Sequence, residues 1–122
     1  MATVLVVDDS GYARRLLRQT LEAGGHAVIE AASGMAGLEA YAMQAPDVVL
    51  LDLTMEDVGG LEVLQRLREI DPNARVIVVS ADIQRATGKQ VAEAGAFRFL
   101  AKPADAEDVI EAVNAALGEG AP

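Results

Sequence analysis

The most informative residues for the fold class of this chain are Asp47-Val48-Val49-Leu50-Leu51-Asp52-Leu53-Thr54. Its central residues, 48–51, are apolar and branched, with no polar residue between them. A continuous apolar run of this length, in contrast to an alternating one, indicates a strand that is covered by helices on both faces. Asp52 ends the run and therefore leaves the predicted sheet at the carboxyl end of the strand, where open α/β sheets bind their ligands.

Strand-like and helix-like segments alternate along the rest of the chain. Further strands are expected at residues 4–7, 27–31, 76–79 and 97–101, and helices at 12–23, 34–43, 61–70, 83–94 and 105–117. Strict alternation predicts a parallel sheet with right-handed crossovers. The five-stranded version is the flavodoxin-like, doubly wound (βα)5 fold with strand order 2-1-3-4-5. We expect one domain over residues 1–118 and a short tail over 119–122.

The composition limits the classes of function. A chain of 122 residues with 52% hydrophobic content can bury a core without covalent cross-links, and the absence of cysteine excludes thiol nucleophiles and Cys-ligated zinc. The net charge of −9 opposes direct binding of nucleic acid, because such binding depends largely on neutralised phosphates. No apolar stretch is long enough to span a membrane, and no signal peptide is recognisable. We therefore expect a cytoplasmic protein without membrane association.

Polar side chains follow four of the five expected strands. Asp8 and Asp9 follow the first strand, Asp52 the third, Ser80 the fourth and Lys102 the fifth. Parallel strands bring their carboxyl ends to one edge of the sheet, so these groups should meet there. Clustered carboxylates are costly to desolvate unless their charge is compensated, and a hard cation such as Mg²⁺ compensates it. An ammonium group beside them suits a phosphate oxygen or a carboxylate.

Four motifs in this order, each at a strand end, resemble the receiver domain of bacterial two-component response regulators, namely Asp8-Asp9, Asp52, Ser80-Ala81 and Lys102-Pro103. The resemblance covers essentially the whole chain. It implies that Asp52 accepts a phosphoryl group from a phosphohistidine on a sensor histidine kinase or a phosphotransfer domain. It also implies that Mg²⁺ is held by Asp8, Asp9, Asp52 and the backbone carbonyl of Thr54.

The same resemblance assigns roles to residues around the acceptor. Ser80 and Lys102 would stabilise the phosphoryl group, Ser80 and Phe99 would act as the switch, and the Lys102–Pro103 peptide would be cis. Thr54 and Asp82 would tune the lifetime of the phosphoryl group. Such a domain is a phosphoacceptor that promotes its own phosphorylation and dephosphorylation, and is not a conventional enzyme.

The implied output is the binding of a downstream protein through the last two helices and the fifth strand. The sequence names neither that protein nor the kinase, and it leaves open a phosphorylation-dependent dimer. It also leaves open whether the domain is free-standing or excised from a longer chain. Gly88 lies inside the helix at 83–94 and costs about 1 kcal/mol relative to alanine. We therefore hypothesise that this helix is the mobile element coupled to Phe99.

Residues outside the constellation have plainer interpretations. Arg14, Arg15 and Arg18 are interpreted as a solvated helix face, with kinase docking as the alternative that the resemblance suggests. Leu16 is expected on the apolar face of the same helix, and His26 is interpreted as a surface residue.

Three alternative functions or roles compete with the leading one. Asp8 and Asp9 could simply stabilise the dipole of the helix that follows them. A phosphatase of the haloacid dehalogenase type also uses a strand-end aspartate, but it requires Asp-x-Asp, and Thr54 occupies the second position here. A flavin-binding protein would need a phosphate loop after the first strand, where Asp8 and Asp9 would repel the phosphate. A colourless protein that does not turn over a generic phosphomonoester would exclude the last two.

Overall fold

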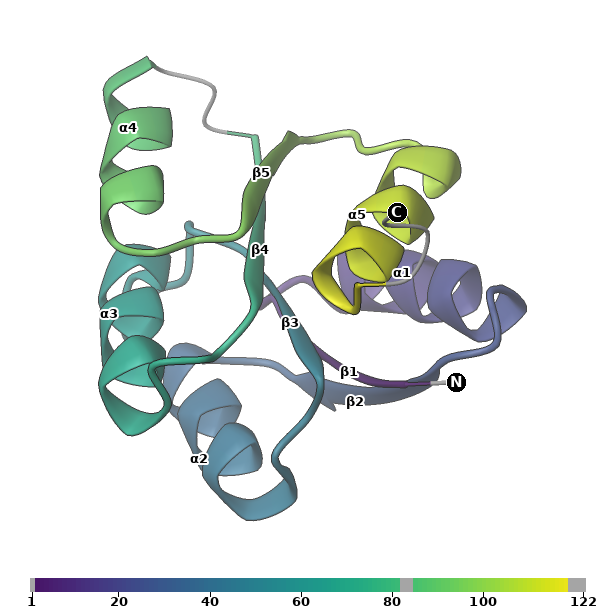
Figure 1. Cartoon of the computed structure of the whole chain (residues 1–122), viewed down its shortest axis with the longest axis horizontal. Coiled ribbons are helices and arrows are strands. Elements are labelled where there is room, and N and C mark those ends of the chain that lie inside the picture. Colours follow the sequence, from purple (N-terminus) through teal and green to yellow (C-terminus); the bar gives the residue numbers. More distant parts are fainter. Residues whose placement is uncertain (1, 82–84, 119–122) are drawn as a thin grey trace.

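Five strands alternate with five helices in the structure, a computed structural model that describes residues 2–81 and 85–118 (Figure 1). The elements are β1 (Thr3–Val7), α1 (Gly11–Ala23), β2 (Ala27–Ala31), α2 (Gly34–Gln44), β3 (Val48–Leu51), α3 (Gly60–Ile70), β4 (Val76–Ser80), α4 (Arg85–Glu93), β5 (Arg98–Ala101) and α5 (Ala106–Ala116). These bounds agree closely with those expected from the sequence, except that the expected start of α4 falls among residues outside the described ranges. No helix in the described ranges is long and apolar enough to cross a membrane.

The sheet is parallel throughout and has the strand order β2-β1-β3-β4-β5, which confirms the predicted doubly wound topology. β1 and β3 are neighbours, and the last pair in their register joins Val7 to Leu51. The chain that leaves β1 and the chain that leaves β3 therefore emerge side by side. This adjacency brings the aspartates that follow the two strands to one place.

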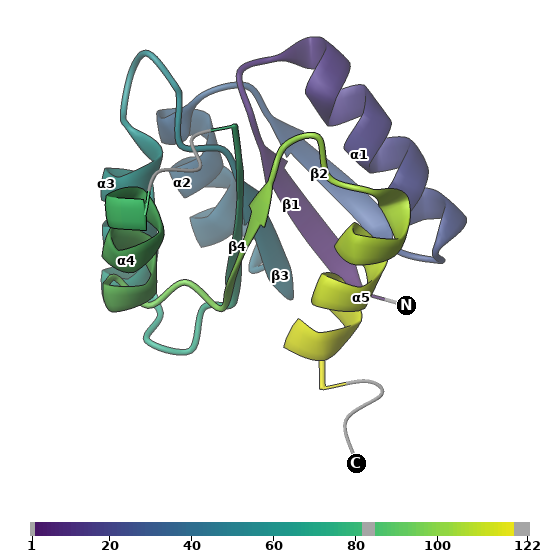
Figure 2. The same cartoon turned by 90° about the horizontal axis from the view of Figure 1, so that it is seen from above.

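Helices cover both faces of the sheet (Figures 1 and 2). One core lies under α1 and α5 and takes Val48 and Leu50 from β3, whereas the other lies under α2, α3 and α4 and takes Val49 and Leu51. All four β3 side chains are buried. The apolar run without alternation thus has the predicted cause, because successive side chains of a strand point to opposite faces and both faces are covered.

The first turn of α2 is capped twice. Ser33 accepts a hydrogen bond from the N–H of Ala36 through its hydroxyl, as an N-cap serine does. Asp57, in the loop between β3 and α3, accepts bonds from the N–H groups of Gly34 and Met35, both at 3.0 Å. The hydrogen bonds from the Met35 and Gly34 backbone lower the pKa of Asp57 from 3.8 to about 2. The loop that follows Asp52 is therefore tied to a helix far away in the sequence.

Two side chains lie where the sequence did not predict them. Leu16 is 46% exposed, whereas Leu17 and Leu21 of the same helix pack into the core under α1 and α5. With Tyr12, Leu16 lines a cavity of about 400 Å³ that also contacts Pro103. His26 is buried and not a surface residue, since its Nδ1 accepts the N–H of Ala2 at 3.3 Å where the chain enters β2 beside the start of β1.

Candidate functional site

Three carboxylates gather at the carboxyl edge of the sheet. Asp8 and Asp9 follow β1 and Asp52 follows β3, and one oxygen from each lies within 4.8 Å of the other two. Asp8 and Asp52 are buried, whereas Asp9 is exposed. Buried carboxylates this close together repel each other and require a compensating positive charge. The sequence predicted this cluster from strand ends alone, and the structure brings its three members together.

Lys102 supplies one compensating charge. Its Nζ donates a hydrogen bond to Asp8 Oδ2 at 2.8 Å and lies 3.5 Å from Asp52 Oδ1. Burial by itself would lower the pKa of Lys102, but the hydrogen bond to Asp8 and the charges of Asp52 and Asp8 outweigh it and raise the pKa above its usual value. The backbone N–H of Lys102 binds the carbonyl of Ser80, and the Lys102–Pro103 peptide bond is cis.

The two side-chain oxygens of Asp52 differ in their hydrogen bonding. Its Oδ2 accepts a hydrogen bond from the hydroxyl of Thr54 at 3.1 Å, and its backbone N–H binds the carbonyl of Val7 at 2.9 Å. Its Oδ1 is buried and accepts no hydrogen bond within the described part of the chain. A buried carboxylate oxygen without a hydrogen bond is unfavourable until a ligand satisfies it. Together with the neighbouring carboxylates, this oxygen offers the hard, anionic donor set that Mg²⁺ prefers.

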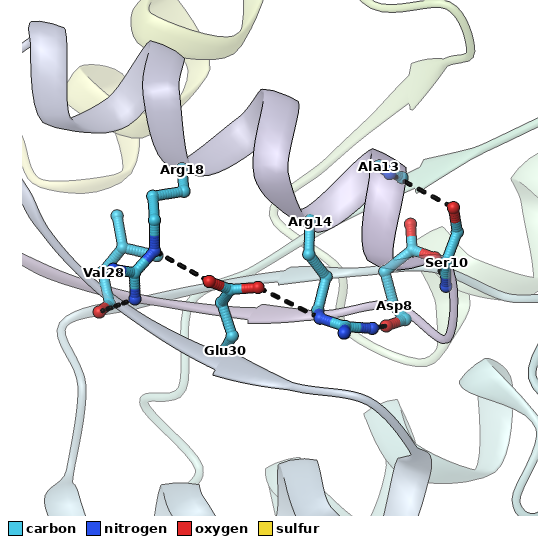
Figure 3. Close-up of polar contacts among 7 residues, drawn as sticks. All are labelled: Asp8, Ser10, Ala13, Arg14, Arg18, Val28 and Glu30. Carbon is cyan, nitrogen blue, oxygen red and sulfur yellow. Dashed lines mark hydrogen bonds and ion pairs between the residues drawn. The ribbon is translucent and has the colours of Figure 1, made fainter.

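The β1–α1 turn that carries Asp8 is held by several hydrogen bonds. The N–H of Ser10 binds Asp8 Oδ1 at 2.9 Å, and the Ser10 hydroxyl caps α1 by accepting the N–H of Ala13. The guanidinium of Arg14 donates to the backbone carbonyl of Asp8 at 2.7 Å (Figure 3). Arg14 and Arg18 are thus not a solvated face as interpreted from the sequence. Both reach β2 because their helix lies directly over that strand, whereas Arg15 is exposed as expected.

Gly60 is a residue of the site that sequence reasoning missed. A Cβ at this position would lie 2.4 Å from the carbonyl oxygen of Asp52 and 2.5 Å from Cα of Leu53. The start of α3 therefore rests against the backbone of the acceptor residue, an approach that only glycine allows. Two consecutive glycines, Gly59 and Gly60, are typical of a turn, but nothing local to them in the sequence indicates which backbone they meet.

The remaining predicted residues lie around the cluster. Ser80 ends β4, is fully buried and pairs in register with Ala101, the residue before Lys102. Phe99 is half-buried and packs against the core under α2, α3 and α4. Asp82 lies outside the described residues, so its predicted part in phosphoryl lifetime has no structural counterpart here.

Comparison with known proteins gives a consistent result. Residues 4–114 match the model of the response regulator receiver domain. The chain is 38% identical over 112 residues to the chemotaxis protein CheY of Thermotoga maritima, covering 91% of this chain and 93% of that protein. The chain therefore belongs to the response regulator receiver domain family, the receivers of two-component signalling.

Solved structures agree with this assignment. A response regulator receiver domain protein from Clostridium thermocellum superposes with a TM-score of 0.92 at 29% identity, covering 97% of this chain and 95% of that one. CheY in a CheX–CheY–BeF₃–Mg complex from Borrelia burgdorferi superposes with a TM-score of 0.90 at 34% identity, covering 94% of this chain and 88% of that one. The receiver fold of this chain thus recurs in solved structures of response regulator receiver proteins.

Proposed function

We propose that Asp52 accepts a phosphoryl group from a phosphohistidine, presented by a sensor histidine kinase or a phosphotransfer domain, in a Mg²⁺-dependent reaction. The observation that carries the proposal is the Asp52 carboxylate itself. It is buried, with Oδ1 free of hydrogen bonds in the described structure, 3.5 Å from an ammonium group and next to two further carboxylates. Asp8, Asp9, Asp52 and the backbone carbonyl of Thr54 would hold the ion.

The residues of the site have separate parts in the transfer. A carboxylate oxygen of Asp52 forms the new P–O bond while the P–N bond to the donor imidazole breaks, and the imidazole leaves after gaining a proton. Mg²⁺, when bound, neutralises charge on the transferring phosphoryl oxygens. Lys102 supplies the second positive charge, exchanging its carboxylate partner for a phosphoryl oxygen. Thr54 keeps the acceptor carboxylate oriented through the hydrogen bond to Oδ2.

Phosphorylation would then change which protein the domain binds. Moving a two-state element from 1:99 to 99:1 requires roughly 5.5 kcal/mol of differential interaction. A hydrogen bond from the Ser80 hydroxyl to a charged phosphoryl oxygen supplies about 1.5–3 kcal/mol, so Ser80 does not suffice alone. Lys102 and α4, coupled through Phe99, would supply the remainder and alter the surface formed by α4, β5 and α5.

The comparisons support this proposal by analogy. The Borrelia burgdorferi CheY superposes on this chain and was crystallised with BeF₃ and Mg, and with CheX. The analogy suggests that residues 1–118 act as one receiver domain in the cytoplasm, with residues 119–122 as a tail. Thr54 and Asp82 would set the phosphoryl lifetime. The output is binding and not turnover of a separate substrate.

Phosphoryl labelling tests the acceptor directly. The protein is incubated with acetyl phosphate with and without Mg²⁺, and incorporation is followed by mass spectrometry of the intact chain. The wild type should be labelled only with Mg²⁺, and Asp52→Asn should not be labelled. Asp105→Asn is the matched control, because Asp105 is an exposed aspartate whose side chain makes no capping bond to α5. Equal labelling of Asp52→Asn and the wild type would show that Asp52 is not the acceptor.

A further inference from the structure

The guanidinium of Arg14 connects three separate parts of the fold (Figure 3). Arg14 lies on α1, its Nε pairs with Glu30 Oε1 on β2 at 3.1 Å, and its Nη1 donates to the carbonyl of Asp8 at 2.7 Å. The pairing of β1 with β2 and β3 stops at Val7, so the Asp8 carbonyl lies past the last residue pair of the sheet. Arg14 therefore provides a hydrogen-bond donor for this carbonyl at the point where the chain turns into the acidic cluster.

The partner of Arg14 is itself held in place. Glu30 Oε2 lies 2.8 Å from Arg18 Nε, one helical turn further along α1, and Arg18 also donates to the carbonyl of Val28 at 3.1 Å. Arg18 lies 3.6 Å from Glu22 as well. Two arginines and two glutamates thus form a network without net charge. Because this network balances its own charge, Arg14 can approach Asp8 without adding an uncompensated positive charge beside a cation site.

We infer that Arg14 is a positioning residue for the metal ligands: its planar fork, fixed on Glu30, holds the Asp8 backbone so that the carboxylates of Asp8 and Asp9 face Asp52. The Arg14 side chain is 19% exposed, so these bonds are better shielded from solvent than those of a typical surface ion pair. Three further bonds hold Asp8, through its N–H to Ala31 and through its carboxylate to Ser10 and Lys102. Within residues 2–81 and 85–118, Arg14 is the one group that donates a hydrogen bond to the Asp8 carbonyl.

The size of the effect follows from the general behaviour of groups that orient metal ligands. Removing such a partner typically weakens metal binding by roughly 10–100-fold. Arg14 acts on the ligand backbone and other bonds to Asp8 remain, so we expect the lower end, a loss of about 10-fold in Mg²⁺ affinity. Simple electrostatics predicts the opposite sign, because deleting a positive charge near three carboxylates strengthens cation binding. The two explanations are therefore distinguishable by sign.

The test titrates MgCl₂ into the wild type and three variants, Arg14→Met, Arg18→Met and Arg15→Met, by isothermal titration calorimetry, with thermal melts recorded without Mg²⁺. Each variant removes one positive charge from α1. Arg18→Met also removes an ion pair with Glu30 but no contact with Asp8, and Arg15→Met removes an exposed side chain. We expect only Arg14→Met to weaken Mg²⁺ binding, by about 10-fold, although Arg14→Met and Arg18→Met should lower Tm by similar amounts. Unchanged or tighter Mg²⁺ binding by Arg14→Met would overturn the inference.

This inference rests on the proposed Mg²⁺ site, and the wild-type titration separates the two. Absence of Mg²⁺ binding by the wild type would overturn both the proposed function and the role of Arg14. Wild-type binding with equal losses in Arg14→Met and Arg18→Met would overturn the role of Arg14 alone, since the effect would then be one of helix packing. If Arg14→Met melts below the temperature of the titration, Arg14→Lys replaces it under the same criterion, because lysine retains the charge but cannot bond both acceptors in one plane.

Discussion

Replacing Gly60 by alanine tests how closely the start of α3 approaches the acceptor residue. The added Cβ would lie 2.4 Å from the Asp52 carbonyl oxygen and 2.5 Å from Leu53 Cα. Packed heavy atoms are normally separated by about 3.5–4.0 Å, so the backbone must move by about 1 Å. Both neighbours are backbone atoms, and no side-chain rotation can relieve the overlap. The hydrogen bond from the Gly60 N–H to the Leu53 carbonyl, now 3.1 Å, would be strained as well.

Two opposing effects set the change in the free energy of unfolding that Gly60→Ala causes. Helix propensity alone would favour alanine over glycine by up to about 1 kcal/mol. Overpacking costs about 1–3 kcal/mol, and contact with backbone places this case near the upper end, so the net free energy of unfolding should fall by about 2 kcal/mol. Gly88→Ala is the matched control, since Gly88 also lies in a helix but its added Cβ would meet nothing within 4 Å. That variant should gain about 0.4–1 kcal/mol.

Urea denaturation followed by far-UV circular dichroism measures both variants, with a constant m-value as the check for two-state behaviour. In thermal melts, a change of 1 kcal/mol shifts Tm by roughly 4 °C for a domain of this size. The Tm of Gly60→Ala should therefore be roughly 8 °C lower than that of the wild type, and the Tm of Gly88→Ala a few degrees higher. Gly60→Ala should also be labelled more slowly at Asp52, because the acceptor backbone has moved. If Gly60→Ala is as stable as the wild type, Gly60 does not approach the backbone of Asp52 and Leu53 as closely as the structure shows. If Gly88→Ala is less stable than the wild type, the balance drawn between helix propensity and overpacking is wrong.

Three further predictions concern the loop beyond β3, a buried tyrosine and α4. The folded-state pKa of Asp57 is lowered from 3.8 to about 2, so its contribution to stability is present above pH 4 and is lost as the pH falls towards 2. Asp57→Asn should flatten the dependence of the urea midpoint on pH in this range. If the midpoints of Asp57→Asn depend on pH as those of the wild type do, the capping role is excluded. Burial and the hydrogen bond to Asp71 raise the pKa of Tyr41 from 10.0 to about 12. The stability that Tyr41 contributes is therefore complete below pH 10 and is lost as the pH rises towards 12. An alkaline absorbance titration of the wild type should contain a step near pH 12 that is absent from Tyr41→Phe. Amides of α4 should exchange with solvent faster than those of α1, and Gly88→Ala should slow them; equal protection of the two helices, with or without a phosphoryl analogue, would contradict the proposal that α4 is the mobile element.

The fold was predictable because its signals are local and repeated. The run from Val48 to Leu51 has no polar residue, and the strands that flank it in the sheet read the same way, so a parallel sheet covered on both faces was the consistent interpretation. The helix starts at Ser10 and Ser33 also rest on local contacts, because the hydroxyl of each serine caps the helix that follows it. Each of these features depends on residues within one turn of each other.

The acidic cluster was predictable for a different reason. Adjacency of β1 and β3 follows from the strand order, and the strand order follows from the strict alternation of strands and helices. Once that order holds, Asp8, Asp9 and Asp52 must meet at one edge of the sheet. Their meeting needed no knowledge of side-chain packing.

Other features depend on pairs of residues that no local pattern connects. Asp57 caps a helix that begins at Gly34, and Gly60 approaches the Asp52 carbonyl only because α3 docks there. His26 is buried because the turn before β2 folds against the start of β1, and Leu16 stays exposed although Leu17 and Leu21 of the same helix reach the core.

Hydrophobic periodicity and chain connectivity are properties of the amino-acid sequence alone. They were enough to predict the order of the elements and the meeting of acids, a hydroxyl and an amine at one edge of the sheet. Three details depend on the tertiary structure: Lys102 Nζ lies closer to Asp8 than to Asp52, Asp52 Oδ1 accepts no hydrogen bond from the described residues, and Arg14 reaches the Asp8 carbonyl. The two Lys102 distances, 2.8 Å to Asp8 and 3.5 Å to Asp52, differ by only 0.7 Å. Such differences depend on how whole helices pack against the sheet, which the spacing of residues along the chain does not encode.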